Sequence, residues 1–462
     1  MNLAERIVLS KSTHLEIYAL ADRNACLAKQ LYNAALFRLR QTFTGWEKES
    51  QTDNEKEVFR ELSQLKQAYP SLSINRVLSY RALEKLMRVT HDPDFFSGLP
   101  MQTAQAIVKA AAADFGNWLK ALKAYREDPA RFSGKPRMPH YCKNDRKAFT
   151  ITNQDAVLYP VLRERKTGKE YTGMELKLPG IRSRMQLPHL AEDARLKEVK
   201  VCPYYGKYIL TLVLEVADIP RQEQRPHLAG IDLGVDNIAA IVTTDHRSRV
   251  YKGGAVLASN RLFHKEKAKA VGILTKGTRH KHVSSRHLDH LSRKHDGFVQ
   301  DTLHKISADI IRFCQEHQVG TIVIGTNPGW KQGADLGRRN NQNFVSIPHE
   351  KLRWMILYKA QAAGIAVVLQ EESYTSRADA SVRDPMPEYG KEEKEWTFSG
   401  KRIGRGLYRC RDGLVINADC NGAANILRKA FPNAWGETKD YRFLACPETV
   451  TFKALNRCQA AG

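Results

Sequence analysis

The fold of this 462-residue chain is decided by the stretch Gly230-Ile231-Asp232-Leu233-Gly234-Val235, which leads into Ile238-Ala239-Ala240-Ile241-Val242-Thr243. Two short apolar runs separated by a glycine-containing turn predict a pair of strands. Asp232 stands at the end of the first strand, between two apolar neighbours and close to a glycine. A carboxylate in this place is poorly suited to a core and well suited to binding a metal ion. An Asp in a turn can also serve only to accept hydrogen bonds from backbone amides.

The rest of the second half alternates between helix and strand, which is typical of an α/β domain. Residues 377–415 interrupt this alternation with an irregular, charged segment. The spacing of apolar residues predicts a helical stretch over 258–316, a short buried strand over 321–325, an amphipathic helix over 347–363, a strand over 365–370 and a last helix over 423–430.

The first half of the chain has a different pattern. It predicts a strand over 7–17, helices over 20–125 and β-structure over 147–216. A basic connector with Pro and Gly, residues 128–139, follows the helices, and residues 220–226 predict a linker to the α/β part. We expect the N-terminal strand to join the β-structure, so that the helices form an insertion between strands.

Two further places carry carboxylates that can act together with Asp232. Asp419 lies in Asn417-Ala418-Asp419-Cys420-Asn421-Gly422 at the opening of the last helix, either as its N-cap or directed at the edge of the sheet. The small residues around it would let the helix approach the sheet closely. Glu371 and Glu372 end the preceding strand, and because neighbouring strand residues point to opposite faces, at most one of them is expected to ligate a metal. In a basic protein such carboxylates favour a phosphodiester site with two Mg²⁺ ions about 4 Å apart.

The net charge favours a polyanionic partner. Lys and Arg number 73 and Asp and Glu 50, which leaves a formal charge of +23 at pH 7. Each phosphate that a Lys or Arg neutralises releases counterions, whereas a solvated basic surface without a partner is the simpler alternative. With 42% hydrophobic residues the chain can fill a core, and no long apolar run predicts a membrane span. Eight cysteines without a CxxC pair, and an N-terminus without a secretory pattern, lead us to expect a reduced cytoplasmic protein.

Six short segments add a more specific signal through their order along the chain. They are Leu31-Tyr32-Asn33-Ala34-Ala35-Leu36-Phe37-Arg38-Leu39-Arg40, Leu99-Pro100-Met101-Gln102-Thr103-Ala104-Gln105, Lys135-Pro136-Arg137-Met138-Pro139, Gly230-Ile231-Asp232-Leu233-Gly234-Val235, Ser373-Tyr374-Thr375-Ser376 and Asn417-Ala418-Asp419-Cys420-Asn421-Gly422-Ala423-Ala424-Asn425-Ile426. In this order the chain resembles the TnpB (OrfB) family of transposon-encoded proteins, which are RNA-guided nucleases related to type V CRISPR effectors and to eukaryotic Fanzor proteins.

The resemblance implies a multidomain chain of the α+β and α/β classes. Its parts would be a wedge-like β-barrel domain over 1–19 and 128–222, a helical recognition insertion over 20–127, a RuvC (RNase H-like) domain over 228–376 and 416–432, a target-nucleic-acid-binding lobe over 377–415 and a C-terminal tail over 433–462.

The resemblance also implies an RNA-guided DNA endonuclease, in which Asp232 is the first RuvC carboxylate and Asp419 the last. Its cofactors would be two Mg²⁺ ions, for which Mn²⁺ can substitute. Its partners would be a guide RNA made from the transposon end and double-stranded target DNA with a short adjacent motif, near the nucleoid of a prokaryote. Guide pairing would supply the sequence specificity. The oligomeric state stays open, and we do not expect strand-joining transposase activity, because the family accompanies a separate transposase.

The sequence departs from this family at the second RuvC motif. The strand that usually ends in Glu ends here in Gly325. Some relatives, including Fanzor proteins, supply a Glu from a later strand, and Glu371 or Glu372 would take that role. The alternative is a nuclease-dead, repressor-like protein that retains RNA-guided DNA binding. We favour the active enzyme because both Asp232 and Asp419 are present.

A second departure concerns zinc. Family members often carry two CxxC pairs in this region, whereas residues 373–419 contain only Cys410. One thiolate cannot build a tetrahedral Cys₄ site, so we expect no zinc. We expect the lobe to be held by the packing of Trp396, Phe398, Leu407 and Tyr408.

Nucleic-acid contacts are expected from basic, aromatic and amide side chains spread along the chain. The histidine-rich stretch over 280–295 is interpreted as a basic helical face near nucleic acid, because Lys and Arg outnumber the carboxylates there. Three of the proposed contact residues share one helix that would face the guide–target duplex. The complete set is Tyr32, Arg38 and Arg40 on that helix, with Gln102, Gln105, Lys135, Arg137, Lys331, Arg338, Arg339, Lys401, Arg402 and Arg405.

Overall fold

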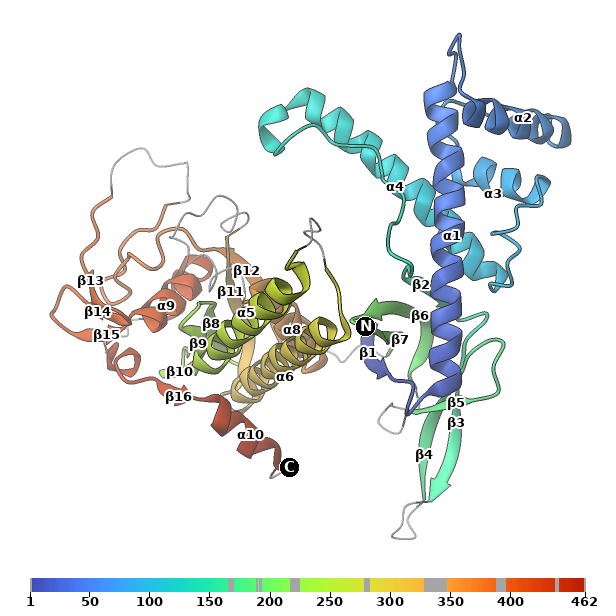
Figure 1. The fold of residues 1–462 in the computed structure, drawn as a ribbon. Helices are drawn as coiled ribbons and strands as arrows, with labels where there is room; N and C mark the ends of the chain where they lie inside the picture. Colours follow the sequence, from blue (N-terminus) through green and yellow to red (C-terminus); the bar gives the residue numbers. More distant parts are fainter. Residues whose placement is uncertain are drawn as a thin grey trace. The chain divides into compact units, whose positions relative to one another are not determined.

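The protein divides into two compact units, Met1–Ala217 and Asp218–Gly462, whose helices and strands are drawn in Figure 1. Each unit has its own hydrophobic core. The structure is a computed structural model that describes residues 2–164, 170–187, 190, 193–216, 225–277, 283–327, 347–387, 396–436 and 440–460. Among the helices in these ranges, none combines the length and apolarity that a membrane-spanning helix requires.

The first unit combines four helices with two antiparallel sheets. Its helices are α1 (Leu15–Gly45), α2 (Asp53–Ala68), α3 (Tyr80–Val89) and α4 (Met101–Glu127), followed by the 3₁₀ turn η1 (Pro129–Arg131). Its strands are β1 (Asn2–Leu9), β2 (Phe149–Thr152), β3 (Val157–Glu164), β4 (Glu170–Lys177), β5 (Arg184–Leu187), β6 (Arg195–Tyr204) and β7 (Lys207–Glu215). The sheet orders are β1-β7-β6-β2 and β3-β4-β5.

The N-terminal strand belongs to the larger of these sheets, as expected. β1 pairs with β7 along its whole length, from Asn2 opposite Glu215 to Leu9 opposite Tyr208. The four helices are therefore inserted in the chain between β1 and β2. The strand expected over residues 7–17 is placed too late, because β1 ends at Leu9 and α1 already begins at Leu15.

The second unit is built on a mixed six-stranded sheet. Its strands are β8 (His227–Asp232), β9 (Asn237–Thr243), β10 (Arg247–Lys252), β11 (Val319–Thr326), β12 (Ala366–Glu371) and β16 (Glu448–Val450), in the order β12-β11-β8-β9-β10-β16. Its helices are α5 (Gly254–Thr275), α6 (Arg286–Glu316), α8 (His349–Ala362), α9 (Ala418–Ala430) and α10 (Phe452–Ala460), with the 3₁₀ turn η2 (Arg442–Leu444). A small antiparallel sheet contains β13 (Lys401–Gly404), β14 (Leu407–Arg409) and β15 (Val415–Asn417).

The strand β8 lies in the middle of the six-stranded sheet, which helices cover on both faces (Figure 1). It runs parallel to β11 and antiparallel to β9, so the predicted strand–turn–strand stretch forms a hairpin. On one face, Ile231 and Ile324 pack in one core with Ile310 of α6. On the other face, Val323 packs in a second core with Ile426 of α9. Near-continuous burial of β9 and β11 is expected for strands covered on both faces.

The segment after residue 432 is more than the tail expected from the sequence. β16 extends the main sheet, pairing in parallel with β10 from Arg249 opposite Glu448 to Tyr251 opposite Val450. Leu455 of α10 joins the core that contains α6. The three-residue strand is too short to show a period in the sequence, which explains why the pattern does not reveal it.

Candidate carboxylate site at the end of the central strand

Asp232 is the last residue of β8 and faces α9. A Cβ built on Gly230, two residues earlier on the same face, would lie 2.3 Å from the Ala423 carbonyl oxygen. A Cβ built on Gly422 would lie 2.6 Å from Oδ2 of Asp232. Ordinary carbon contacts are longer than this, so α9 packs more closely on β8 than side chains at these positions would permit. The close approach expected from the small residues around Asp419 is confirmed.

Asp419 lies in the first turn of α9, and its carboxylate is not the cap of that helix. Asn417 is the N-cap, since its side-chain oxygen accepts hydrogen bonds from the backbone N–H groups of Asp419 at 3.0 Å and Cys420 at 3.1 Å. The same cap explains why the helix begins at Ala418 and not at residue 423. Oδ2 of Asp419 instead accepts a hydrogen bond from Nδ2 of Asn237, 2.6 Å away on β9.

Gly325 and Asp232 each directly follow the last pair between β11 and β8, Ile324 opposite Ile231. A Cβ built on Gly325 would lie only 2.5 Å from Oε2 of Glu372. The carboxylate of Glu372, which follows β12, therefore occupies the space that a side chain on β11 would take. A carboxylate delivered from the next strand thus stands beside the position where the sequence lacks one.

Glu371 and Glu372 have different surroundings. Oε2 of Glu371 pairs with Nζ of Lys429 at 2.6 Å, and Oε1 accepts a hydrogen bond from the Ser373 backbone N–H at 2.7 Å. Burial opposes ionisation, but these hydrogen bonds lower the pKa of Glu371 below its usual range. Glu371 is thus already neutralised by a protein cation, whereas Glu372 approaches Gly325.

The carboxylates of Asp232, Glu372 and Asp419 interact electrostatically. Burial, followed by the charges of Glu372 and Asp419, raises the pKa of Asp232 well above its usual range. Burial also raises the pKa of Glu372, opposed by the guanidinium of Arg353. Arg353 is itself buried on α8 and donates a hydrogen bond from Nη2 to the Gly325 carbonyl oxygen at 3.2 Å. Three acidic groups are thus held together against their mutual repulsion.

These residues fit a divalent cation by their chemistry. All three side chains offer carboxylate oxygens, which Mg²⁺ prefers, and a bound cation would relieve the repulsion that contributes to the raised pKa of Asp232. Within the described ranges, no three His, Cys, Asp or Glu side chains already converge closely enough to hold a metal ion. The fit is therefore one of charge and ligand type.

A cleft of about 730 Å³ opens beside Asp419. Its lining includes Asn237 and the cationic side chains Lys252, Arg402 and Arg405. Arg402 lies near enough to Asp232 to oppose the rise in its pKa. Arg405 forms a bidentate ion pair with Asp236, in which the Arg405 Nε lies 2.7 Å from the Asp236 Oδ2. A phosphate backbone in this cleft would meet cations next to the carboxylates.

Two nucleic-acid contacts predicted for α1 are wrong. Arg38 is buried, with Nε and Nη2 each 2.8 Å from Glu61 and Nη1 2.8 Å from Asp92. Tyr32 is also buried, and its hydroxyl donates to Oδ2 of Asp114 at 2.7 Å. Both side chains therefore tie α1 to its neighbours inside the first unit.

The other predicted contact residues differ in their surroundings. Arg40 donates to the Pro139 carbonyl oxygen at 2.6 Å, and Gln105 donates to Glu84 at 3.2 Å, whereas Gln102 is half-buried. Five more of the predicted residues are exposed, namely Lys135, Arg137, Lys401, Arg402 and Arg405. Lys331, Arg338 and Arg339, together with His280 and His282 of the histidine-rich stretch, lie outside the described residues.

The lobe over residues 377–415 is organised by carboxylates more than by the expected aromatic packing. Trp396 and Leu407 are exposed, which corrects that expectation, although Tyr408 is buried. Asp379 accepts hydrogen bonds from Ser381 and from the Arg411 backbone, the latter at 2.8 Å. The other acceptor, Asp384, binds the backbone N–H groups of residues 379 and 399 at 3.0 and 2.8 Å. Two buried Asp side chains thus connect separate segments of this lobe.

Sequence reasoning missed several residues that position the carboxylates. Asn237, Arg353 and Lys429 each bind a site carboxylate or the backbone beside one, from three different elements. Their partners are distant in sequence, so no local spacing reveals them. Only Asn417 had a usable signal, because an Asn directly before a helix is a preferred N-cap.

Two family models match separate segments of the second half. A model described as "Probable transposase" (OrfB_IS605) matches residues 211–331, and one described as "Cas12f1-like, TNB domain" matches residues 349–426. The first segment contains Asp232 and the second contains Glu372 and Asp419.

Two known proteins resemble a little under half of this chain in sequence. A CRISPR-associated endodeoxyribonuclease Cas12f1 of Sulfoacidibacillus thermotolerans is 30% identical over 45% of this chain and 46% of that protein. The TnpB-like protein ORF457 of Acidianus two-tailed virus is 29% identical over 46% of this chain and 44% of that protein. The matched regions thus span a little under half of these relatives. A solved Cas12f1–sgRNA–target DNA complex shares a TM-score of 0.48 and 13% identity, covering 89% of this chain and 82% of that one.

The two family models contain the three motifs of the second half, at residues 230–235, 373–376 and 417–426. These matches, over residues 211–331 and 349–426 for the family models and under half of each relative, support a protein of the TnpB (OrfB) family that is similar to Cas12f proteins.

Proposed function

We propose that the protein is an RNA-guided, Mg²⁺-dependent DNA endonuclease associated with a transposable element. The observation that carries this proposal is the position of Glu372, whose carboxylate fills the space beside Gly325 and acts electrostatically on Asp232. The site thus retains three acidic side chains on the face of the sheet that α9 covers. The relatives named as endodeoxyribonucleases support the same reaction class.

The topology of the second unit supports its assignment as a RuvC domain. The strands β10-β9-β8-β11-β12 form a mixed sheet in which only β9 runs against its neighbours β8 and β10. This is the order expected of an RNase H-like fold, with the first acidic residue at the end of the first strand. We assign residues 228–376 and 416–432 to this domain, residues 1–19 and 128–222 to a wedge-like domain, and residues 20–127 to a recognition insertion.

The chain's own residues would prepare the scissile phosphate for in-line attack by water. Bound Mg²⁺ would activate that water and stabilise the leaving oxygen. Asp232, Glu372 and Asp419 supply the ligand oxygens, and Asn237 keeps the Asp419 carboxylate directed at the site through its 2.6 Å hydrogen bond. Arg402 and Lys252 line the adjoining cleft, where they would bind neighbouring phosphates and exclude a competing orientation of the strand.

The partners follow from charge and from the relatives. A formal net charge of +23 suits a guide RNA paired with target DNA, which together present many phosphates. One matched structure is described as a complex of Cas12f1 with single-guide RNA and target DNA. In our proposal a guide RNA from the element end pairs with a target that carries a short adjacent motif, and the lobe over 377–415 works without zinc through Asp379 and Asp384.

A second candidate function is RNA-guided DNA binding without cleavage. It is favoured by Gly325 and by the finding that no three ligand side chains in the described ranges already converge on a metal position. This candidate predicts stable binding of guide and target, with no cleavage in Mg²⁺ or Mn²⁺.

The proposal is tested by expressing the protein with its flanking DNA, sequencing the RNA that copurifies, and supplying matched DNA with Mg²⁺. We expect a discrete RNA from the element end and cleavage of matched DNA. Asp232→Ala should abolish cleavage and leave RNA binding intact. Continued cleavage by that variant would refute the assigned site, and target binding without cleavage by the unaltered protein would establish the second candidate.

A further inference from the structure

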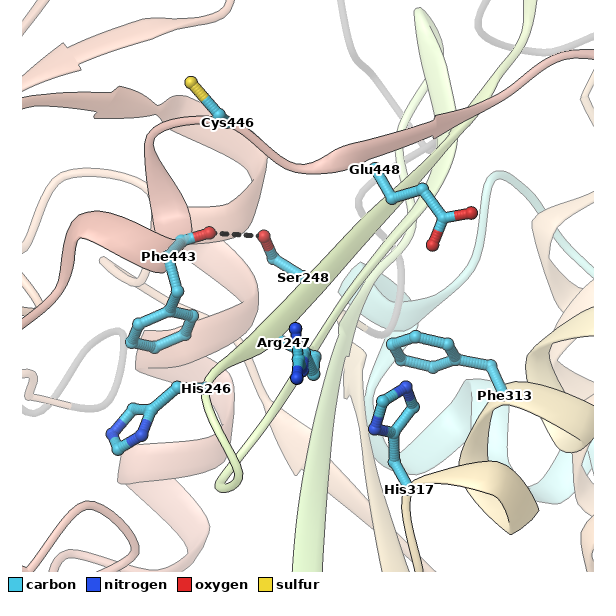
Figure 2. A pocket seen from close by; sticks show the side chains of 8 residues that line it. All are labelled: His246, Arg247, Ser248, Phe313, His317, Phe443, Cys446 and Glu448. Carbon is cyan, nitrogen blue, oxygen red and sulfur yellow. Dashed lines mark hydrogen bonds between the residues drawn. The ribbon is translucent and has the colours of Figure 1, made fainter.

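A separate pocket of about 350 Å³ lies at the opposite end of the same sheet. On β9, Ala240 is opposite Asp232, whereas Thr243 is opposite Ala229 and leads into the turn that forms the pocket. The carboxylate site and the pocket therefore occupy opposite ends of the β8–β9 hairpin. The pocket is lined by His246, Arg247, Ser248, Phe313, His317, Phe443, Cys446 and Glu448 (Figure 2).

The acidic side chains around this pocket are already paired. Glu448 accepts a hydrogen bond from Arg249 Nε at 2.8 Å, and Asp309 pairs with Arg249 at 3.0 Å. Asp245 lies 2.8 Å from Nδ1 of His317. Among the described residues at this pocket, the carboxylates therefore offer no open site for a cation.

Arg247 differs from these charged groups. Its side chain is exposed, and within the described part of the chain it has no ion-pair or hydrogen-bond partner. Only its backbone forms hydrogen bonds with a side chain: the Thr243 hydroxyl donates to the Arg247 carbonyl oxygen and accepts from the Arg247 N–H group. Figure 2 shows the guanidinium between the His246–Phe443 side of the pocket and the Phe313–His317 side. The charge with which this pocket can bind a ligand is therefore the positive charge of Arg247.

Aromatic and imidazole rings line this pocket together with Arg247. His246 and Phe443 have ring centroids 5.0 Å apart, and His246 also stacks on Trp435 at 6.3 Å. On the other side, Phe313 and His317 are 4.5 Å apart. His246 adopts φ +63°, a left-handed conformation that is uncommon outside glycine and asparagine, so the turn holds this ring in place at some conformational cost.

We propose that this pocket binds one nucleotide of a single-stranded nucleic acid, with its phosphate on Arg247 and its base against the His246–Phe443 rings. A guanidinium pairs well with phosphate oxygens, and aromatic rings stack on any base without requiring a given sequence. A small anion would contact the guanidinium but not the rings. A metal ion would find no unpaired carboxylate among the described residues of the pocket. The proposal depends on the proposed nuclease function only for the source of the nucleotide, since the pocket contains none of the cleavage residues.

Cys446 supplies a direct readout, because it lines the pocket and its side chain is exposed. The full-length protein, freed of bound RNA and held in EDTA to prevent cleavage, is treated with iodoacetamide, and alkylation of Cys446 is followed by peptide mass spectrometry. The probes are uridine 5′-monophosphate, an octamer of single-stranded RNA, the matching DNA octamer and inorganic phosphate. We expect the nucleotide and at least one octamer to slow alkylation of Cys446, and inorganic phosphate to leave it unchanged at the same concentration.

Arg247→Gln should weaken protection by the nucleotide about tenfold, since it removes a charge-assisted contact with phosphate. Lys453→Gln removes an exposed charge from α10 and should leave protection unchanged, which controls for the loss of one charge. A preference between the RNA and DNA octamers would identify the source of the nucleotide. The proposal is overturned by equal protection from inorganic phosphate, by no protection from any nucleotide, or by equal weakening in both variants. Failure of cleavage would not affect this result, because no step of the assay requires cleavage.

Discussion

Glu371 and Glu372 are adjacent in sequence, and their surroundings predict that neutralising each one has a different consequence. Glu371→Gln removes the partner of Lys429, whose side chain is only 8% exposed. Leaving a buried ammonium without its charged partner costs about 1–2 kcal/mol, because the glutamate is one-third exposed and part of the interaction is screened. We therefore expect a lower unfolding temperature, by a few degrees, and retained cleavage at temperatures where the protein is folded.

Glu372→Gln should have the reverse effect. This variant removes one of the like charges that raise the pKa of Asp232, so the metal-free protein should be as stable as before or more stable, by about 1 kcal/mol. It also removes a proposed ligand, and cleavage should fall at least about a hundredfold.

The assay pairs thermal unfolding in EDTA with single-turnover cleavage of guide-matched DNA in Mg²⁺, using equal amounts of RNA-loaded protein. Each variant serves as the control for the other, since both replace one carboxylate by an amide in consecutive residues. The reasoning is refuted if Glu372→Gln cuts at the normal rate, or if Glu371→Gln loses cleavage without losing stability.

Three further predictions concern close packing and titration. Gly325→Ala places a Cβ 2.5 Å from Oε2 of Glu372 and 2.7 Å from Cδ1 of Ile426. Both atoms end side chains that can shift, so we expect a loss of stability of up to about 1 kcal/mol, together with slower cleavage because the Glu372 carboxylate is displaced. Gly297→Ala on α6 meets no atom within 4 Å and should stabilise by up to about 1 kcal/mol; equal effects of the two variants in thermal unfolding would contradict this. Burial lowers the pKa of Lys359 to about 8, so the unfolded chain binds more protons between about pH 8 and 10.5 and stability should rise with pH there. Denaturant titrations across that pH window should show a smaller rise in the stability of Lys359→Met. An unchanged dependence of stability on pH in this variant would contradict the role given to Lys359. Burial and neighbouring carboxylates raise the pKa of Asp232, so the stability of the metal-free protein should fall as pH rises through the folded-state pKa of this residue. Asp232→Asn should flatten that fall. If the variant and the unaltered protein lose stability in parallel, the titration of Asp232 is not the cause.

The parts of the site that the sequence predicted are those with local signals. Asp232 follows an apolar strand and precedes a glycine, and Asp419 lies among small residues at a helix start. Both positions depend on patterns of a few residues, and the structure brings both side chains to the same face of the sheet. The strand–turn–strand stretch likewise forms the β8–β9 hairpin.

The parts that could not be predicted depend on partners far apart in the chain. The difference between Glu371 and Glu372 rests on Lys429 and on the space above Gly325, neither of which a strand pattern records. Arg38 shows the same limit in the first unit: its helical spacing fits a nucleic-acid contact, whereas its carboxylate partners lie 23 and 54 residues away. Charge in a sequence indicates a possible partner only when its intramolecular pairs are known.

Guided cleavage by the unaltered protein tests the central claim most directly. The purified protein–RNA complex is given double-stranded DNA that matches its guide, with Mg²⁺ or with EDTA, and the product ends are determined. The account predicts cleavage in Mg²⁺ alone, with 5′-phosphate ends and no cutting of unmatched DNA. Tight binding of matched DNA without cleavage in either Mg²⁺ or Mn²⁺ would contradict it, because Asp232, Glu372 and Asp419 would then be acidic neighbours without catalytic function.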